Sequence, residues 1–117
     1  MRLKWIKCQS DVWCKLNFVN LNHDHFNNRR GIYIIWHGGS EPAVVYVGQG
    51  NIKDRIVQHR DNQQIQRYAH LDLYVTWATV SAEYRDGVER YLADNWDPKV
   101  GAAHPIADPI EVNSPWD

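Results

Sequence analysis

The sequence predicts a mixed α/β domain of the α+β type, in which a small antiparallel three-stranded sheet is flanked by helices. Two apolar runs, 32–36 and 43–47, are rich in β-branched and aromatic residues and are separated by a polar loop with two glycines and a proline. This pattern is typical of a β-hairpin with a loop longer than two residues. The run 71–80 alternates between two faces, one of them strongly apolar, and predicts a third strand. Apolar residues at helical spacing follow the second and third strands.

The composition fits one domain with one hydrophobic core, because the chain has 117 residues, of which 44% are hydrophobic and 12% aromatic. We expect a core over residues 30–101, an N-terminal extension over 1–29 and an irregular tail over 102–117. No stretch approaches the roughly 20 apolar residues of a membrane span, and residues 1–10 are too charged for a secretory signal. We therefore expect a cytoplasmic protein without a membrane segment.

The N-terminal extension contains an apolar stretch at 12–19 that suits one or two strands. A polar loop with four asparagines and two histidines follows at 20–28. The extension could therefore add a strand to the sheet or cover its edge.

The alternation of side chains along a strand predicts which residues of the hairpin share a face. Tyr33 is expected on the face opposite to its two isoleucine neighbours. In the second strand, Val44 and Tyr46 are expected on the face opposite to Val45 and Val47. Each strand can therefore place one tyrosine on a common surface.

A helix is predicted directly after the second strand. Two glycines allow a sharp turn there, and Asn51 is a favourable N-cap. Ile52 and Ile56 form the expected buried stripe, while Arg55 and His59, also four residues apart, lie on a neighbouring face. Two tyrosines, an arginine and a histidine are thereby expected at one end of the sheet.

The polar stretch 61–70 is expected to continue this helix or to form a loop. A second helix is predicted to begin after Ser81, a favourable N-cap, and to end near Trp96–Pro98, since proline cannot continue a helix. Gly87 weakens this helix and indicates close packing against the sheet. The expected buried stripe consists of Tyr84, Val88, Tyr91, Leu92 and Asn95.

The chain carries the triplets GIY at 31–33 and YVG at 46–48, then Arg55 and His59 on the next predicted helix and Glu89 on a later one, and this order of motifs resembles the GIY-YIG nuclease family. The triplet GIY at 31–33 matches the first motif of the family, and YVG at 46–48 matches the second, with valine in the middle position. The family places an arginine and then a histidine on the next helix, which match Arg55 and His59. It also places a metal-binding glutamate on a later helix, which matches Glu89 in the segment GVERYLADNWDP.

The match spans about residues 30–101, and it implies a metal-dependent endonuclease that hydrolyses phosphodiester bonds in DNA. One Mg²⁺ or Mn²⁺ ion would be held by Glu89, since Mg²⁺ keeps several waters and one carboxylate is sufficient. One of the two tyrosines would position and deprotonate the attacking water, and the resemblance leaves open which one. The implied catalytic residues are Tyr33, Tyr46, Arg55, His59 and Glu89.

The sequence departs from the family at one position. Members usually carry an asparagine a few residues after the proline that follows the glutamate helix, where this chain has Gly101. Asn95, Asn113 or a backbone group could substitute for it. If the asparagine is required to fix the metal site, the alternative function is a non-catalytic nucleic-acid-binding module that keeps the fold.

The charge distribution is uneven, although the net charge is −1. Residues 1–60 contain nine Lys and Arg against four Asp and Glu, whereas residues 61–117 contain four against ten. The positive half offers an electrostatic footprint for a phosphate backbone, and the N-terminal extension could be an arm that contacts DNA. A second copy or another protein could supply specificity. The expected DNA contacts are Arg30, Gly48, Gln49, Asn51, Lys53 and Arg60.

The two cysteines, Cys8 and Cys14, are expected to be thiols in a reducing compartment. Together with His23 and His25 they suggest a third hypothesis, a zinc-stabilised interaction domain. Their spacing does not match the usual zinc-finger pattern, so we expect the chain to fold without zinc.

Overall fold

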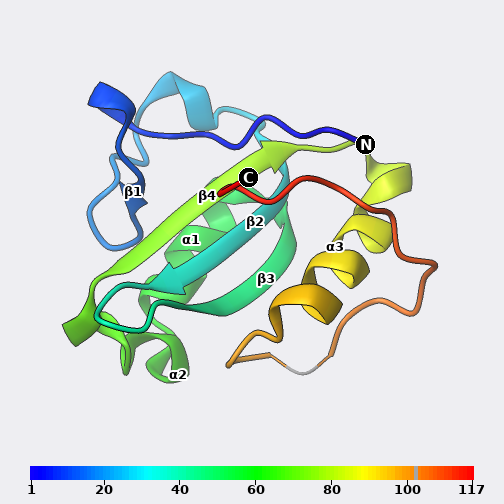
Figure 1. The fold of residues 1–117 in the computed structure, drawn as a ribbon. Helices are drawn as coiled ribbons and strands as arrows, with labels where there is room; N and C mark the ends of the chain where they lie inside the picture. Colours follow the sequence, from blue (N-terminus) through cyan, green and yellow to red (C-terminus); the bar gives the residue numbers. More distant parts are fainter. Residues whose placement is uncertain (102) are drawn as a thin grey trace.

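The strand β2 (Arg30–His37) lies at the centre of the sheet in the computed structural model, which describes residues 1–101 and 103–117. It pairs antiparallel with β3 (Ala43–Asn51) on one side and with β4 (Leu73–Thr79) on the other (Figure 1). The short strand β1 (Cys14–Lys15) pairs with the outer edge of β4 and gives the order β1-β4-β2-β3. The α+β class is confirmed, but the sheet has four strands rather than three because the N-terminal extension contributes one.

Helices cover both faces of the sheet, so that β2 is buried on each side. The helix α1 (Ile52–Arg60) and the short helix α2 (Gln63–Gln66) lie on one face, and α3 (Ala82–Trp96) lies on the other (Figure 1). One cluster of buried side chains fills the α1 face and a second fills the α3 face. Every residue from Gly31 to His37 is consequently buried.

A β-bulge in the hairpin changes the predicted alternation along β3. Ile35 pairs with Tyr46, whereas the next residue of β2 pairs with Val44, so that Val45 is the extra residue. Val44 therefore packs in the α3-facing core together with Val47, and Val45 packs in the α1-facing core. The prediction that Val44 shares a face with Tyr46 is wrong, because a bulge resets the two-residue period.

The first helix begins as predicted. The Asn51 side chain accepts a hydrogen bond from the backbone N–H of Asp54 at 3.0 Å. The polar stretch that follows does not prolong α1, because Asn62 caps the separate helix α2 through the N–H groups of Gln64 and Ile65. A 3₁₀ turn at Ala69–Leu71 then leads into β4.

The buried face of α3 differs from the predicted stripe. Tyr84 and Asn95 are exposed, and Ser81 makes no side-chain capping bond although it lies at the N-cap position. The buried residues are Gly87, Val88, Glu89, Leu92 and Ala93. The face is rotated because α3 also packs against the C-terminal tail. A Cβ at Gly87 would lie 2.6 Å from the Ile110 side chain, so its close contact is with the tail and not the sheet.

The two ends of the chain are joined to each other. The Asn113 side chain accepts a hydrogen bond from the N–H of Leu3 at 2.6 Å and donates one to its carbonyl at 3.0 Å. The N-terminal ammonium donates to the carbonyl of Glu111. The tail is irregular, as predicted, but it is anchored along the α3 face (Figure 1). Ala102, the first residue of the predicted tail, lies outside the described residues.

The N-terminal extension covers the edge of β4. The N–H of Ile6 donates to the carbonyl of Trp77 at 2.9 Å, and the Thr76 hydroxyl donates to the carbonyl of Ile6 at 2.7 Å. The extension thus both adds a strand and covers an edge, which are the two structural alternatives that the sequence left open.

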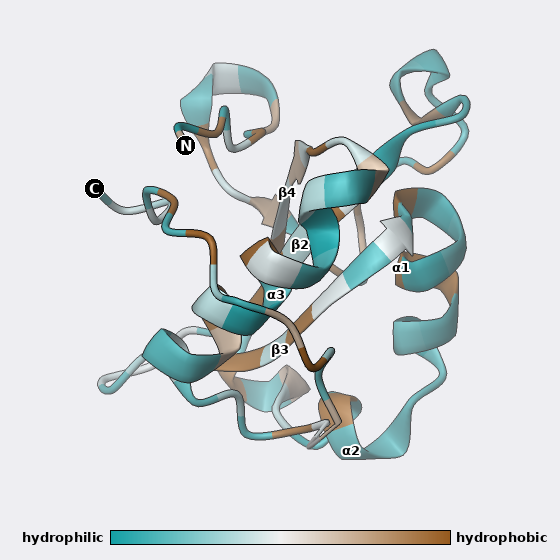
Figure 2. Ribbon diagram, turned by 90° about the vertical axis from the view of Figure 1, so that its right-hand side faces the viewer, coloured by the Kyte–Doolittle hydropathy of each residue, from teal (hydrophilic) through white to brown (hydrophobic). Residues whose placement is uncertain are grey.

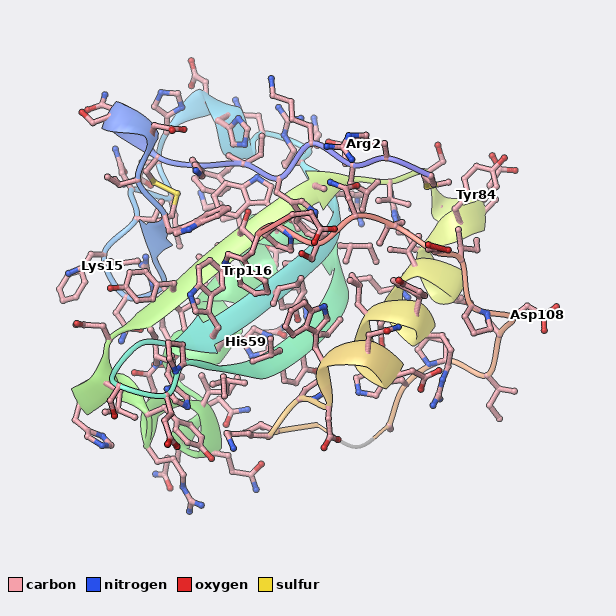
Figure 3. All side chains as sticks on the ribbon, in the orientation of Figure 1. Arg2, Lys15, His59, Tyr84, Asp108 and Trp116 are labelled. Carbon is pink, nitrogen blue, oxygen red and sulfur yellow. A yellow bond between two sulfur atoms is a disulfide. The ribbon has the colours of Figure 1, made fainter. Side chains whose placement is uncertain are left out.

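The two cysteines form a disulfide, drawn as the yellow bond in Figure 3. The expectation that Cys8 and Cys14 are thiols is therefore wrong. Disulfides persist mainly in oxidising compartments, so this bond does not support the expected cytoplasmic location. No helix in the described part of the chain has the length and apolar character needed to cross a bilayer.

Replacing Asn113 with alanine should lower the free energy of unfolding by about 1–3 kcal/mol, because the backbone groups of Leu3 then lose their partly buried partners. Urea unfolding followed by tryptophan fluorescence measures this loss. Asn95→Ala is the matched control, since Asn95 is exposed and should change stability by less than about 0.5 kcal/mol. Equal effects of the two substitutions would show that the joined termini contribute nothing specific.

Candidate active site

The hydroxyl of Tyr33 is the centre of a polar cluster beneath α1. Its oxygen lies 2.6 Å from His59 Nε2, and Arg55 Nε donates to it at 3.1 Å. Tyr33 points from β2 toward α1, where Arg55 and His59 lie one turn apart. The i, i+4 spacing of these two residues therefore directs both side chains to the same phenol.

Tyr46 joins this cluster from the neighbouring strand. Its ring stacks on that of Tyr33 with a centroid distance of 6.0 Å and an interplanar angle of 9°. Arg55 Nη2 donates to the Tyr46 hydroxyl at 3.4 Å, and the Tyr46 and His59 rings lie 4.5 Å apart. The structure thus brings together four of the five predicted catalytic residues.

Burial determines the protonation of the cluster. Tyr33 is fully buried, and this burial raises its pKa well above 10, an effect that the hydrogen bond from Arg55 offsets only in part. Burial, followed by the charge of Arg55, lowers the pKa of His59 from 6.5 to about 4. At neutral pH both groups are uncharged, and Arg55 supplies the positive charge.

One atom of the cluster has no hydrogen-bond partner. Among the described residues, His59 Nδ1 is the only buried side-chain nitrogen or oxygen that lacks a hydrogen-bond partner. The Tyr33 oxygen already accepts from Arg55, so its proton is free to be donated to His59 Nε2. The neutral imidazole then carries its own proton on Nδ1.

Gly48 allows the Tyr33 hydroxyl to reach the edge of the sheet. It pairs with Tyr33 across the hairpin, and a Cβ at this position would lie 2.7 Å from Tyr33 Cζ. Figure 2 shows β3 changing from hydrophobic to more hydrophilic colours toward its C-terminal half, the part of the strand that contains Gly48 and Gln49. Gly48 therefore has a structural role in the site, in addition to its predicted place among the DNA contacts.

Glu89 lies on the other face of β3, in α3. Its Oε1 accepts a hydrogen bond from Gln49 Nε2 at 3.1 Å, and its Oε2 lies 2.9 Å from His104 Nδ1. Only 8% of the Glu89 side chain is exposed. Gln49 also donates to Asp86 at 2.9 Å. Because consecutive strand residues face opposite sides, Gly48 and Gln49 connect the tyrosine cluster with the carboxylate around the edge of the sheet.

The residues that follow α3 cross this edge and, together with His104 of the tail, contact both parts of the site. The N–H groups of Lys99 and Val100 donate to β3 carbonyls, the latter to Val45 at 2.8 Å. Gly101 then lies against the ring of Tyr46, and His104 reaches Glu89. A groove of about 610 Å³ opens beside these residues and includes Lys99, Gly101 and His104 in its lining.

Gly101 cannot be replaced by the asparagine of the resembled family without a rearrangement. Its φ is +82°, and a Cβ would lie 2.7 Å from Tyr46 Cε2. The proposed substitutes are engaged elsewhere, since Asn95 donates to the carbonyl of Tyr91 and Asn113 binds Leu3. Neither forms a hydrogen bond with the five predicted catalytic residues within the described residues.

His104 and Asp86 are site residues that the sequence did not reveal. His104 lies in the tail, which has no periodicity that could place it against α3. Asp86 precedes Glu89 by three residues and therefore shares a helix face with it. The i, i+3 spacing of two acids on one helix was the available signal.

The predicted DNA contacts fall into two groups. Arg60 donates to the carbonyls of Leu16 and Val19, both at 2.8 Å, so its charge holds the N-terminal extension. Asn51 caps α1, and Gln49 binds acidic side chains of α3. Arg30 is exposed and Lys53 is half-buried. The DNA contacts of all six residues stay predictions.

The residues of the zinc hypothesis have other partners. Cys8 and Cys14 are bonded to each other, and His25 Nε2 accepts a hydrogen bond from Trp77 Nε1 at 3.0 Å. Across residues 1–101 and 103–117, no group of three or more His, Cys, Asp or Glu side chains is arranged to hold a metal ion.

The low pKa of His59 should make stability depend on pH. The unfolded chain binds a proton at His59 below pH 6.5, whereas the folded protein does so only near pH 4. Stability should therefore fall as the pH is lowered through this window, by on the order of 1–3 kcal/mol. Urea unfolding measured at intervals from pH 7 to 4 should show that the free energy of unfolding depends less steeply on pH in His59→Gln than in wild type. His70→Gln, at an exposed position, should keep the wild-type slope.

Comparison of the chain with models of known protein families, with curated proteins and with solved structures finds no match in any of the three.

Proposed function

We propose that this protein is a metal-dependent endonuclease that hydrolyses phosphodiester bonds in DNA and has a GIY-YIG-like fold. The observation that carries the proposal is the convergence of Tyr33, Tyr46, Arg55 and His59 in one hydrogen-bonded cluster, with Glu89 around the adjacent strand edge. A purely structural core has no need of a buried carboxylate at this place.

The residues present fit a single divalent cation. Glu89 offers a nearly buried carboxylate whose orientation is fixed by Gln49, and an imidazole nitrogen lies 2.9 Å from one of its oxygens. A bound ion would stabilise negative charge that develops on the phosphoryl and leaving oxygens. The adjacent groove has room for water and for a phosphate group.

Arg55 would bind the phosphate from the other side of the edge. Its guanidinium stays charged at every relevant pH and is held by the two tyrosines and by Gln58. A donor that is oriented before the reaction stabilises developing charge without reorganisation. Its predicted role therefore depends on a geometry that the cluster already maintains.

Tyr46 is the better candidate for contact with the attacking water. Tyr33 is fully buried, and its hydroxyl already has two partners. Tyr46 is half-buried, and its hydroxyl receives only a long hydrogen bond from Arg55. We assign Tyr33 and His59 the role of orienting Arg55 and Tyr46.

The second candidate function is a nucleic-acid-binding module without catalysis. It is favoured by the replacement of the expected asparagine with Gly101 and by the two hydrogen bonds that occupy the Glu89 carboxylate. In that case the basic N-terminal half would still bind a phosphate backbone, and the cluster would serve stability alone.

Incubation of supercoiled plasmid with the protein, with and without Mg²⁺ or Mn²⁺, tests the proposal. We expect nicking that requires the ion and that disappears in Glu89→Gln, which keeps the size of the side chain but removes its charge. DNA binding should survive the substitution and weaken with salt, because the basic half supplies the attraction. Wild-type protein that binds but never cleaves DNA or RNA would leave the binding module as the function.

Two arginines of α1 should behave differently when they are replaced with alanine. Arg55→Ala should reduce cleavage roughly 10²–10³-fold with little loss of stability, since it removes an oriented donor to phosphate. Arg60→Ala should lower stability by about 1.5–3 kcal/mol and leave the cleavage rate of the folded protein nearly unchanged, because it holds two backbone carbonyls. Single-turnover cleavage and urea unfolding measure both effects, and the same pattern in both variants would contradict the assignment of Arg55.

A further inference from the structure

We propose that His104 is a second protein ligand of the divalent ion, and that the pair Glu89 and His104 favours a first-row transition metal such as Mn²⁺ over Mg²⁺. The inference rests on the proposed function, because it concerns the ion that Glu89 would hold. It adds a ligand that lies outside the segment resembling the GIY-YIG family.

The two donor atoms already have the spacing of neighbouring ligands. Glu89 Oε2 and His104 Nδ1 lie 2.9 Å apart. Adjacent ligands of an octahedral ion with bonds of about 2.1 Å are separated by about 3 Å. An ion bound by both atoms would lie to one side of the line that joins them, so the carboxylate and the imidazole would turn toward it while their separation stays nearly the same. Neutral imidazole offers the Nδ1 lone pair when its own proton is on Nε2.

The surroundings of the pair resemble those of a metal ligand more than those of a surface hydrogen bond. The two side chains are only 8% and 9% exposed. Gln49 donates to the second oxygen of Glu89, which fixes the plane of the carboxylate. The groove of about 610 Å³ is lined by His104 and not by Glu89, so water or substrate phosphate would approach the ion from the side of His104.

The chain is anchored on both sides of His104. Before it, the N–H of Val100 donates to the carbonyl of Val45 at 2.8 Å, and after it the N–H of Ile110 donates to the carbonyl of Gly87 at 3.0 Å. The segment that follows α3 runs back beside that helix (Figure 1). The imidazole is therefore supplied by an anchored loop.

The donor set accounts for the choice of ion. Mg²⁺ requires oxygen ligands and gives up water reluctantly, whereas imidazole is a common ligand of first-row transition metals. A site with one carboxylate and one imidazole consequently binds Mn²⁺ more tightly than a carboxylate alone, while Mg²⁺ gains little from the nitrogen.

The test compares wild type with His104→Asn, which keeps an N–H donor near the position of Nδ1 but lacks the imidazole. Free Mn²⁺ is measured by electron paramagnetic resonance without nucleic acid, and Mg²⁺ by competition with Mn²⁺. We expect Mn²⁺ affinity to fall about 10-fold or more in the variant, with a smaller change for Mg²⁺. Spin-echo spectroscopy should detect an Mn²⁺-bound imidazole nitrogen in wild type only. His70→Asn is the control for an exposed histidine, and melting without metal checks the fold.

Equal Mn²⁺ affinity in wild type and His104→Asn would overturn the proposal. Tighter binding of both Mn²⁺ and Mg²⁺ by His104→Asn would also overturn it, because it would mean that His104 only covers the carboxylate. A parallel loss for both ions without a nitrogen signal would assign it a positioning role instead. Binding that persists in Glu89→Gln would remove the site altogether. Failure of cleavage with intact Mn²⁺ binding would count against the nuclease and leave the metal site standing.

Discussion

The strand β2 imposes the constraint on which the rest of the structure depends. It is hydrogen-bonded along both edges and covered on both faces, so each side chain from Ile32 to His37 must be accommodated in a core. Tyr33 brings a phenol hydroxyl into this interior, and a buried hydroxyl without a partner costs about 1–3 kcal/mol. Arg55 and His59 satisfy it from α1. The polar cluster is therefore also the means by which the central strand can contain a tyrosine.

Burial leaves two opposite charges at the edge of the sheet. Tyr33 and His59 are neutral at physiological pH, while Arg55 lies on one side of β3 and the carboxylate of Glu89 on the other. Hydrolysis of a phosphodiester is assisted by a divalent cation, which a carboxylate can hold, and by a positive group such as a guanidinium, which binds the phosphate oxygens. A phosphodiester bound across this edge would offer its negative charge to the guanidinium, and a divalent ion held by Glu89 would separate the carboxylate from the phosphate oxygens, which is why the proposed function places the substrate there.

Local patterns predicted the hairpin, α1 and the gathering of Tyr33, Tyr46, Arg55 and His59, because the two-residue and four-residue periods are properties of neighbouring residues. The remaining features depend on distant partners. The bulge at Val45 arises within the hairpin without a glycine to signal it, and the buried face of α3 is set by a tail that shows no periodicity. The Cys8–Cys14 bond and the contact of His104 with Glu89 likewise require three-dimensional proximity that spacing does not encode.

The joining of Leu3 to Asn113 has a consequence for the order of folding. These residues are 110 positions apart, so their contact closes almost the whole chain into a loop. Contacts of such high sequence separation form only after more local units have collapsed, since the entropy of closing the loop opposes them. The hairpin and α1 can assemble the tyrosine cluster early, during synthesis of the chain. The carboxylate on α3 would receive His104 only when the tail docks, so the pair that we propose to bind the metal would be the last part of the molecule to form.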